Sequence, residues 1–158
     1  KGAQVSVPPC YRSAELRATE LHPHPSSWPA RPDRFHFDSL AHDNAALSSE
    51  VSRYNLPSAA PHPQGPGLPT LLGPATLEGT QTVSKFNKPD SEADTVLIQL
   101  ALWRIPDRDA DVTLSVNWPV RSGATGEERD ATEARKVFDE AWRSFQINDF
   151  GLFAGSAS

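Results

Sequence analysis

The sequence contains one cysteine, no methionine, no long apolar run and no cluster of basic residues. The single thiol, Cys10, excludes a disulfide within the chain and any zinc site built from several cysteines. No stretch approaches the roughly 18–20 apolar residues that cross a membrane, so a membrane-spanning protein is excluded. The formal net charge is −5, with 15 Lys and Arg against 20 Asp and Glu. This balance excludes a typical nucleic-acid binder, because phosphate contacts need clustered positive charge.

Length and proline content predict how the chain is organised. At 158 residues, it has the length of one domain, which we expect to span residues 1–158. Ten of the 15 prolines gather in two clusters, and we predict loops at 22–33 and 56–74. Proline lacks an N–H donor and restricts the residue before it, which disfavours helices and central strands. The chain begins with Lys1 rather than methionine, which leaves open a targeting segment removed from its start.

Alternation of polar and apolar residues predicts several strands. The clearest are Thr95–Ile105 and Asp111–Trp118, which residues 106–110 would join as a β-hairpin. Further strands are predicted at Gln4–Val7, Arg34–Asp38, Ser49–Tyr54 and Gly79–Phe86. In Arg34–Asp38 the alternation would place both phenylalanines on one face. Ser49–Tyr54 is alternatively the end of a short helix that begins near residue 43.

A helix is predicted from about Asp130 to Phe145, because its apolar residues recur with helical spacing. The stripe that would lie on the sheet consists of Val137, Phe138, Ala141, Trp142 and Phe145. Asp130 or Thr132 is suited to cap its start. Antiparallel strands followed by a helix packed on one face predict an α+β fold.

The sequence shows no motif for catalysis or cofactor binding. It has no phosphate-binding loop, no GxSxG nucleophile elbow and no HExxH zinc motif. His22 and His24 could offer two imidazoles to a metal, but no third ligand is identifiable nearby, so we interpret them as solvated loop residues. Cys10 would need a histidine base to act as a nucleophile, and we interpret it as a structural thiol. Trp28, among prolines, is a candidate interaction anchor.

Three aspartates have the alternate spacing of a calcium-binding loop. They are Asp107, Asp109 and Asp111. Such a loop also needs glycine at its sixth position and glutamate at its twelfth, where this chain has Val112 and Trp118. We therefore predict a charged hairpin tip rather than a metal site, and we expect neither a cofactor nor enzymatic activity.

Several segments resemble those of one family in their order and spacing. Between residues 79 and 153 they are GTQ at 79–81, KFN at 85–87, LALWRIP at 100–106, DVTLSVNWP at 111–119, SFQIND at 144–149 and LF at 152–153. They are similar to the "ALLRLP" strand, the "TDLLLTFNxP" strand and the "sLxIxDxxLF" end of the Mog1 family, the Ran guanine-nucleotide release factors. GAQVSVPP at 2–9, SAELR at 13–17 and RFHF at 34–37 also resemble segments of that family.

The resemblance implies a Mog1/PsbP-like α+β fold, in which a central antiparallel sheet has helices on both faces. It implies a non-enzymatic protein that binds the Ran GTPase, promotes nucleotide release and supports nuclear protein import. Such a protein would act in the nucleus and cytoplasm, without a cofactor, and we expect a monomer.

One departure from the family affects the predicted site. In the family, "DLR" is followed by "QVPDNQEVF" and a hydrophobic strand, and the acidic residues of that segment are central to the Ran contact. Here Arg17 is followed at once by ATEL at 18–21, which resembles the end of that strand. The acidic segment therefore has no counterpart in this chain. Ser13, Glu15 and Arg17 match the leading edge of the motif and are the candidate partner-contact residues.

A second hypothesis belongs to another class of protein. The divergent first half and the proline-rich loops would suit a PsbP-like extrinsic or scaffold subunit of a larger assembly, including an organellar one. A transit peptide on the full-length gene would distinguish this hypothesis from a nucleocytoplasmic factor. A small hydrolase that uses Cys10 or a histidine has no constellation of residues to support it.

Overall fold

The computed structural model describes residues 14–20, 32–55, 69–84 and 89–151, the first of these by its backbone. In chain order the elements are β1 (Ala14–Glu20), α1 (Pro32–Asp43), β2 (Ser48–Asn55), β3 (Leu72–Val83), β4 (Asp94–Ile105), β5 (Ala110–Arg121) and α2 (Thr132–Ser144). Two short 3₁₀ helices, Asp90–Glu92 and Pro106–Arg108, precede β4 and β5.

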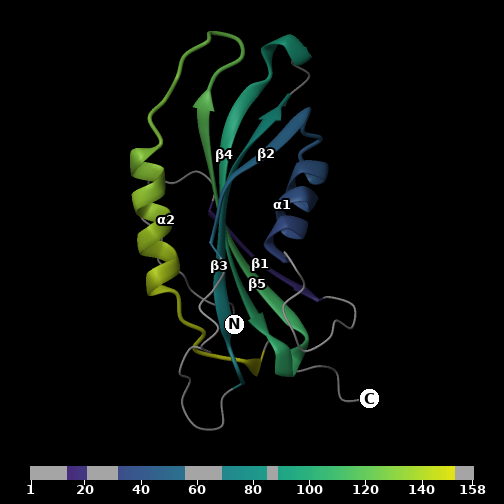
Figure 1. The fold of residues 1–158 in the computed structure, drawn as a ribbon, viewed down its shortest axis with the longest axis vertical. Coiled ribbons are helices and arrows are strands. Elements are labelled where there is room, and N and C mark those ends of the chain that lie inside the picture. Colours follow the sequence, from purple (N-terminus) through teal and green to yellow (C-terminus); the bar gives the residue numbers. More distant parts are fainter. Residues whose placement is uncertain (1–13, 21–31, 56–68, 85–88, 152–158) are drawn as a thin grey trace.

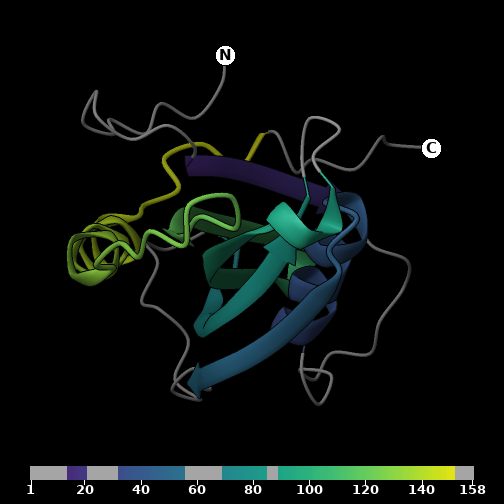
Figure 2. The same ribbon diagram turned by 90° about the horizontal axis from the view of Figure 1, so that it is seen from above.

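The strands form one antiparallel sheet with the order β1-β5-β4-β3-β2. Helix α2 covers one face of this sheet and α1 covers the other (Figure 1). The view from above in Figure 2 shows the sheet between the two helices. The predicted α+β fold, a central antiparallel sheet with a helix on each face, is confirmed.

The central strand β4 is buried on both faces. All nine residues from 97 to 105 are buried, as expected for a strand covered on both sides. The hydrophobic cluster on the α2 face consists of Leu71, Ala101, Trp103, Ile105, Val112, Leu114, Val116, Phe138 and Phe150. The cluster on the α1 face consists of Phe37, Leu77, Ile98 and Leu100. Strand β4 contributes side chains to both clusters and so joins the two halves of the core.

The elements with the clearest periodicity are confirmed. Strands β4 and β5 form the predicted hairpin, closed by the pair Ile105 and Ala110. Four of the five predicted stripe residues of α2 pack on the sheet: Phe138 is buried in the cluster, and Ala141, Trp142 and Phe145 pack against it, whereas Val137 is not part of it. The Trp103 and Phe145 rings lie 4.2 Å apart between centroids. Residues 49–54 lie within β2, which decides between the strand and the helix considered for them.

The strand predicted at Arg34–Asp38 is wrong, because these residues lie in α1. Alternation over five residues is too short to distinguish a strand from a helix by pattern alone. The predicted loop at 22–33 also ends earlier than expected, since Pro32 is the first residue of α1. Proline is favoured at this first helical position, where its missing N–H has no partner to lose.

Strand β3 begins within the second predicted loop, at Leu72, and not at Gly79. The register with β4 shifts between Leu72 and Ala75, and such an irregularity is where a strand tolerates a proline such as Pro74. The strand ends at Val83, short of the predicted end at residue 86. The strand predicted at residues 4–7 lies outside the described residues.

Helix α1 docks on the sheet through a close contact at Gly79. The Phe37 side chain is fully buried and lies directly over this glycine. A Cβ atom at Gly79 would lie 2.7 Å from Phe37 Cζ and 2.4 Å from the Glu50 carbonyl oxygen. Because Gly79 has no side chain, the Phe37 ring can occupy this space.

We expect Gly79→Ala to lower the free energy of unfolding by about 2–3 kcal/mol, the cost of overpacking a closely packed core. Thr80→Ala is the matched control, because Thr80 is the next residue of β3 and is half-buried on the opposite face. We expect it to cost about 1 kcal/mol or less. Urea unfolding followed by circular dichroism measures both. Equal stability of Gly79→Ala and the unsubstituted protein would contradict this account of α1 docking.

Candidate partner-binding face

Strand β5 carries polar residues on a side of the sheet that is buried. Val112, Leu114 and Val116 belong to the cluster on the α2 face. The residues that alternate with them are Asp111, Thr113 and Ser115, which are also buried. By the two-residue period of a strand, these three face the α1 side. Burying polar groups costs free energy unless they are hydrogen-bonded, so this polar row is a feature that the hydrophobic core does not require.

At one end of the row, Asp111 connects α1 to β4 and β5. Its Oδ2 atom lies 3.4 Å from His36 Nε2 of α1. Its Oδ1 atom lies 3.9 Å from Nη1 of Arg104, which is its cross-strand partner in β4. A second carboxylate, Asp109, lies 3.6 Å from Nη2 of the same arginine. The Asp111 and Arg104 side chains are only 3% and 5% exposed, so this is a buried charge cluster.

The prediction of a charged hairpin tip is therefore wrong for Asp111, which is buried within β5. It holds for the exposed Asp107, whose Oδ2 accepts a hydrogen bond from the backbone N–H of Thr70 at 2.7 Å. Spacing alone does not distinguish the two aspartates. Asp107 lies in the 3₁₀ helix Pro106–Arg108, whereas Asp111 lies within β5 and contacts α1, a helix that the sequence pattern did not predict.

Two of the three predicted contact residues are aligned with this polar row. Strand β1 lies at the edge of the sheet and pairs with β5. Glu15 is the register partner of Ser115, Arg17 of Thr113, and Thr19 of Asp111. Ser13 lies outside the described residues. The candidate partner-binding face is therefore defined as the edge strand β1 together with the N-terminal half of α1, both of which adjoin the buried polar row of β5.

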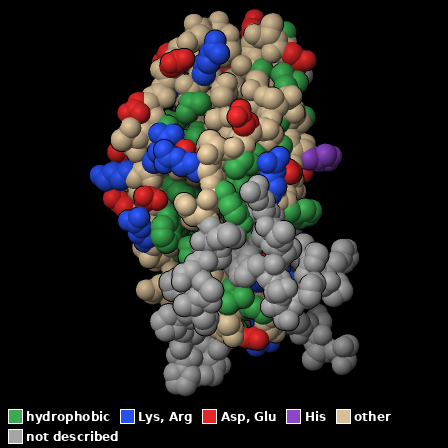
Figure 3. All heavy atoms as spheres, in the orientation of Figure 1, with side chains coloured by type: hydrophobic (Ala, Val, Ile, Leu, Met, Phe, Trp, Pro, Cys, Tyr) green, Lys and Arg blue, Asp and Glu red, His purple; other side chains and the backbone are tan. Residues whose placement is uncertain are grey.

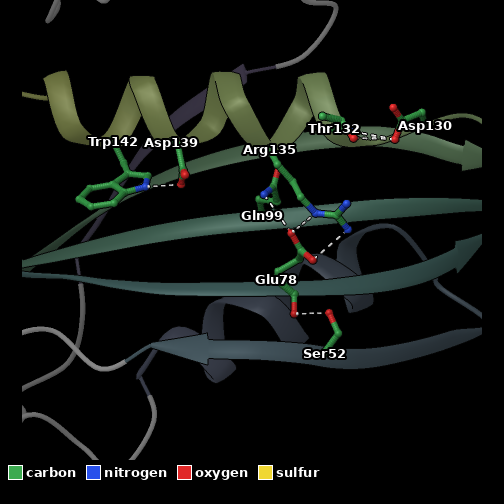
Figure 4. A network of polar contacts seen from close by, with 8 residues as sticks. All are labelled: Ser52, Glu78, Gln99, Asp130, Thr132, Arg135, Asp139 and Trp142. Carbon is green, nitrogen blue, oxygen red and sulfur yellow. Dashed lines mark hydrogen bonds and ion pairs between the residues drawn. The ribbon is translucent and has the colours of Figure 1, made fainter.

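The opposite face of the sheet is held by a different polar network, shown in Figure 4. Arg135 of α2 donates two hydrogen bonds to the carboxylate of Glu78 in β3, at 3.0 Å from Nε and 3.1 Å from Nη2. Gln99 of β4 donates a third from Nε2 at 3.1 Å. The hydrogen bonds to Glu78 raise the pKa of the Arg135 guanidinium above its ordinary value. This contact fixes α2 on the sheet, and we interpret it as structural.

The start of α2 depends on Asp130. Its Oδ1 atom accepts hydrogen bonds from the Thr132 hydroxyl at 2.8 Å and from the Thr132 backbone N–H at 3.1 Å. The residue at the cap position itself is Ala131, so the predicted capping by Asp130 is made from one residue earlier. The hydrogen bond from the Thr132 side chain is the main cause that lowers the pKa of the Asp130 carboxyl below 3.8.

The sequence also singled out four residues from the first part of the chain. His22, His24, Cys10 and Trp28 lie outside the described residues. Within the part of the chain that the structure describes, no three His, Cys, Asp or Glu residues gather in a way that could hold a metal ion. Among the helices described, none combines the length and apolar character that a membrane span requires.

The comparisons with known proteins first define the class of fold. The solved structure of a glutamate-to-alanine mutant of the protein Mog1 is similar to this chain, with a TM-score of 0.58 and 23% sequence identity. The alignment covers 88% of this chain and 69% of that one. At this identity the likeness shows the fold alone, which is the α+β fold of Mog1.

Sequence comparison then defines the family. The family model described as "Ran-interacting Mog1 protein" matches residues 26–119, which is more than half of the chain. This chain belongs to the Mog1 family. The match includes α1 and most of β5 but begins after β1, so Glu15 and Arg17 remain predictions. No curated protein matches the chain.

We expect Asp111→Ala to lower the free energy of unfolding by about 3 kcal/mol, because it removes the buried carboxylate that lies between Arg104 and His36. Asp107→Ala is the matched control in the same hairpin and removes one exposed hydrogen bond, which contributes about 1 kcal/mol. Chemical denaturation measures the two costs. If both variants lost the same stability, the buried charge cluster would not hold α1 to β5.

The lowered pKa of Asp130 predicts how the free energy of unfolding depends on pH. A carboxyl whose pKa is lowered by folding stabilises the folded protein at pH values above 3.8, and this contribution is lost as the pH falls further. We expect Asp130→Asn, which keeps the acceptor oxygen without the charge, to lose less stability than the unsubstituted protein between neutral and acid pH. Unfolding free energies measured across this range test the sign. Parallel curves for the two proteins would contradict it.

Proposed function

We propose that this chain is a non-enzymatic partner of the Ran GTPase that promotes nucleotide release and supports nuclear protein import. The observation that carries the proposal is membership of the Mog1 family, whose model is described as Ran-interacting. The proposal extends that description to release of the nucleotide and to a role in both nucleus and cytoplasm.

The physical basis of nucleotide release is linkage between two binding events on the GTPase. A partner that binds the nucleotide-free GTPase more tightly than the loaded one must weaken nucleotide binding by the same factor. The chain needs no catalytic residue for this effect, only a surface that prefers one state of the GTPase. The candidate partner-binding face offers a strand at the sheet edge beside a buried polar row. The formal net charge of −5 would favour a basic partner surface.

The direct test is release of labelled GDP and GTP from Ran, measured with and without this chain and accompanied by a binding titration. We expect binding and faster release that saturates with the concentration of the chain. Binding without faster release would overturn the release activity alone. Absence of both, from a folded sample, would overturn the proposal and favour the alternative of an assembly subunit.

Substitutions in β1 test whether Ran contacts this strand. We expect the double substitution Glu15→Ala and Arg17→Ala to weaken Ran binding about 10-fold or more, because both residues lie in the edge strand of the proposed face. Glu50→Ala is the control, because Glu50 is an exposed acidic residue on the opposite edge strand, β2. The titration above measures both variants. Equal loss of affinity in the two, or loss only in the control, would move the contact away from β1.

A further inference from the structure

Phe35 is a large apolar residue that the fold does not use. It is 60% exposed and belongs to neither hydrophobic cluster. Successive residues of an α-helix are about 100° apart, so Phe35 and Phe37 point to opposite sides of α1. Phe37 enters the core, whereas Phe35 faces outward beside the exposed Asp38 and Ser39. A surface helix normally keeps this side polar, so Phe35 departs from the pattern expected of α1.

The position of Phe35 connects it to the candidate partner-binding face. Its ring meets the ring of His36 edge-on, with centroids 5.5 Å apart. His36 in turn reaches Asp111 of β5, the residue in register with Thr19 of β1. Phe35 therefore stands next to the contact that joins α1 to the polar row, and it is continuous with the proposed face.

The surroundings of Phe35 resemble the arrangement at a protein interface, an apolar centre with a polar rim. Arg34 and Asp38 form an exposed ion pair of 2.8 Å between Nε and Oδ2, one helical turn apart. Figure 3 shows the described surface in the orientation of Figure 1, with charged and apolar side chains interspersed over it. The two residues of the ion pair flank Phe35 along α1, and Phe35 itself stays 60% exposed.

We propose that Phe35 is the apolar anchor of this face and inserts into an apolar pocket of the bound GTPase. The proposal rests on the proposed function and names the residue that supplies affinity. A protein partner is favoured over a lipid surface, because a chain with a net charge of −5 is repelled by anionic headgroups. Aromatic residues that are exposed in the free protein and buried on binding supply a large share of interface energy.

The experiment compares the full chain with Phe35→Ala, Phe35→Leu and Leu47→Ala in a titration against Ran. Leu47 is the matched control, because it is an exposed apolar residue, 49% accessible, beyond the other end of α1. We expect Phe35→Ala to weaken binding about 30-fold, as at an interface hot spot. Phe35→Leu should recover part of the affinity, and Leu47→Ala should change it less than about 2-fold. Thermal unfolding of Phe35→Ala should stay within about 2 °C of the unsubstituted chain.

The outcomes separate this inference from the proposed function. If the unsubstituted chain binds Ran and Phe35→Ala binds equally well, the anchor is wrong and the function stands. If the unsubstituted chain does not bind, both are overturned. A large drop in thermal stability of Phe35→Ala would assign Phe35 to the fold and overturn the anchor. Sedimentation of the chain alone measures whether it self-associates. If the unsubstituted chain is a dimer and Phe35→Ala is a monomer, Phe35 contacts a second copy of the chain instead of Ran, and the proposed anchor is overturned.

Discussion

The burial of β4 on both faces is the constraint on which the rest of the structure depends. A strand with nine consecutive buried residues needs a covering layer on each side. Helix α1 supplies one layer through Phe37, which fits over Gly79, and α2 supplies the other through Phe138. The two helices are far apart in the sequence, yet each covers a different side of the same strand.

The two helices are held on the sheet by different kinds of contact. On the α2 face, hydrophobic packing is supplemented by the bidentate contact between Arg135 and Glu78. On the α1 face, the small cluster around Phe37 is supplemented by the buried contacts of His36, Asp111 and Arg104. Buried charges gain little net stability but are costly to leave unpaired. The α1 face therefore tolerates few changes at these buried charged residues.

Periodicity predicted the elements whose apolar side chains alternate strictly with polar ones or recur with regular helical spacing. The β4–β5 hairpin alternates cleanly, and α2 has a continuous apolar stripe, so both were predicted with nearly correct bounds. Helix α1 was missed because Phe35 faces outward, which gave Arg34–Asp38 the alternation of a strand. The start of β3 was missed because Gly73 and Pro74 resemble a loop.

The polar contacts were less accessible to sequence reasoning than the elements. His36 and Asp111 are 75 residues apart in the chain, and Arg135 and Glu78 are 57 apart. No local pattern distinguishes the buried Asp111 from the exposed Asp107, although one lies within β5 beside His36 of α1 and the other in the short connection before β5. Glu15 and Arg17 were proposed from family resemblance alone, and the register of β1 with β5 is what aligns them with the polar row.

The edge strand β2 contains a bulge that affects how it can pair with strands of other molecules. Its register with β3 shifts between Val51 and Arg53, and the intervening Ser52 donates its hydroxyl to the Glu78 carbonyl oxygen at 3.1 Å. A bulge bends an edge strand and interrupts its regular row of backbone donors and acceptors. An unprotected edge would recruit strands from other chains and seed fibrils. The bulge in β2 thus protects this side of the protein against aggregation at high concentration.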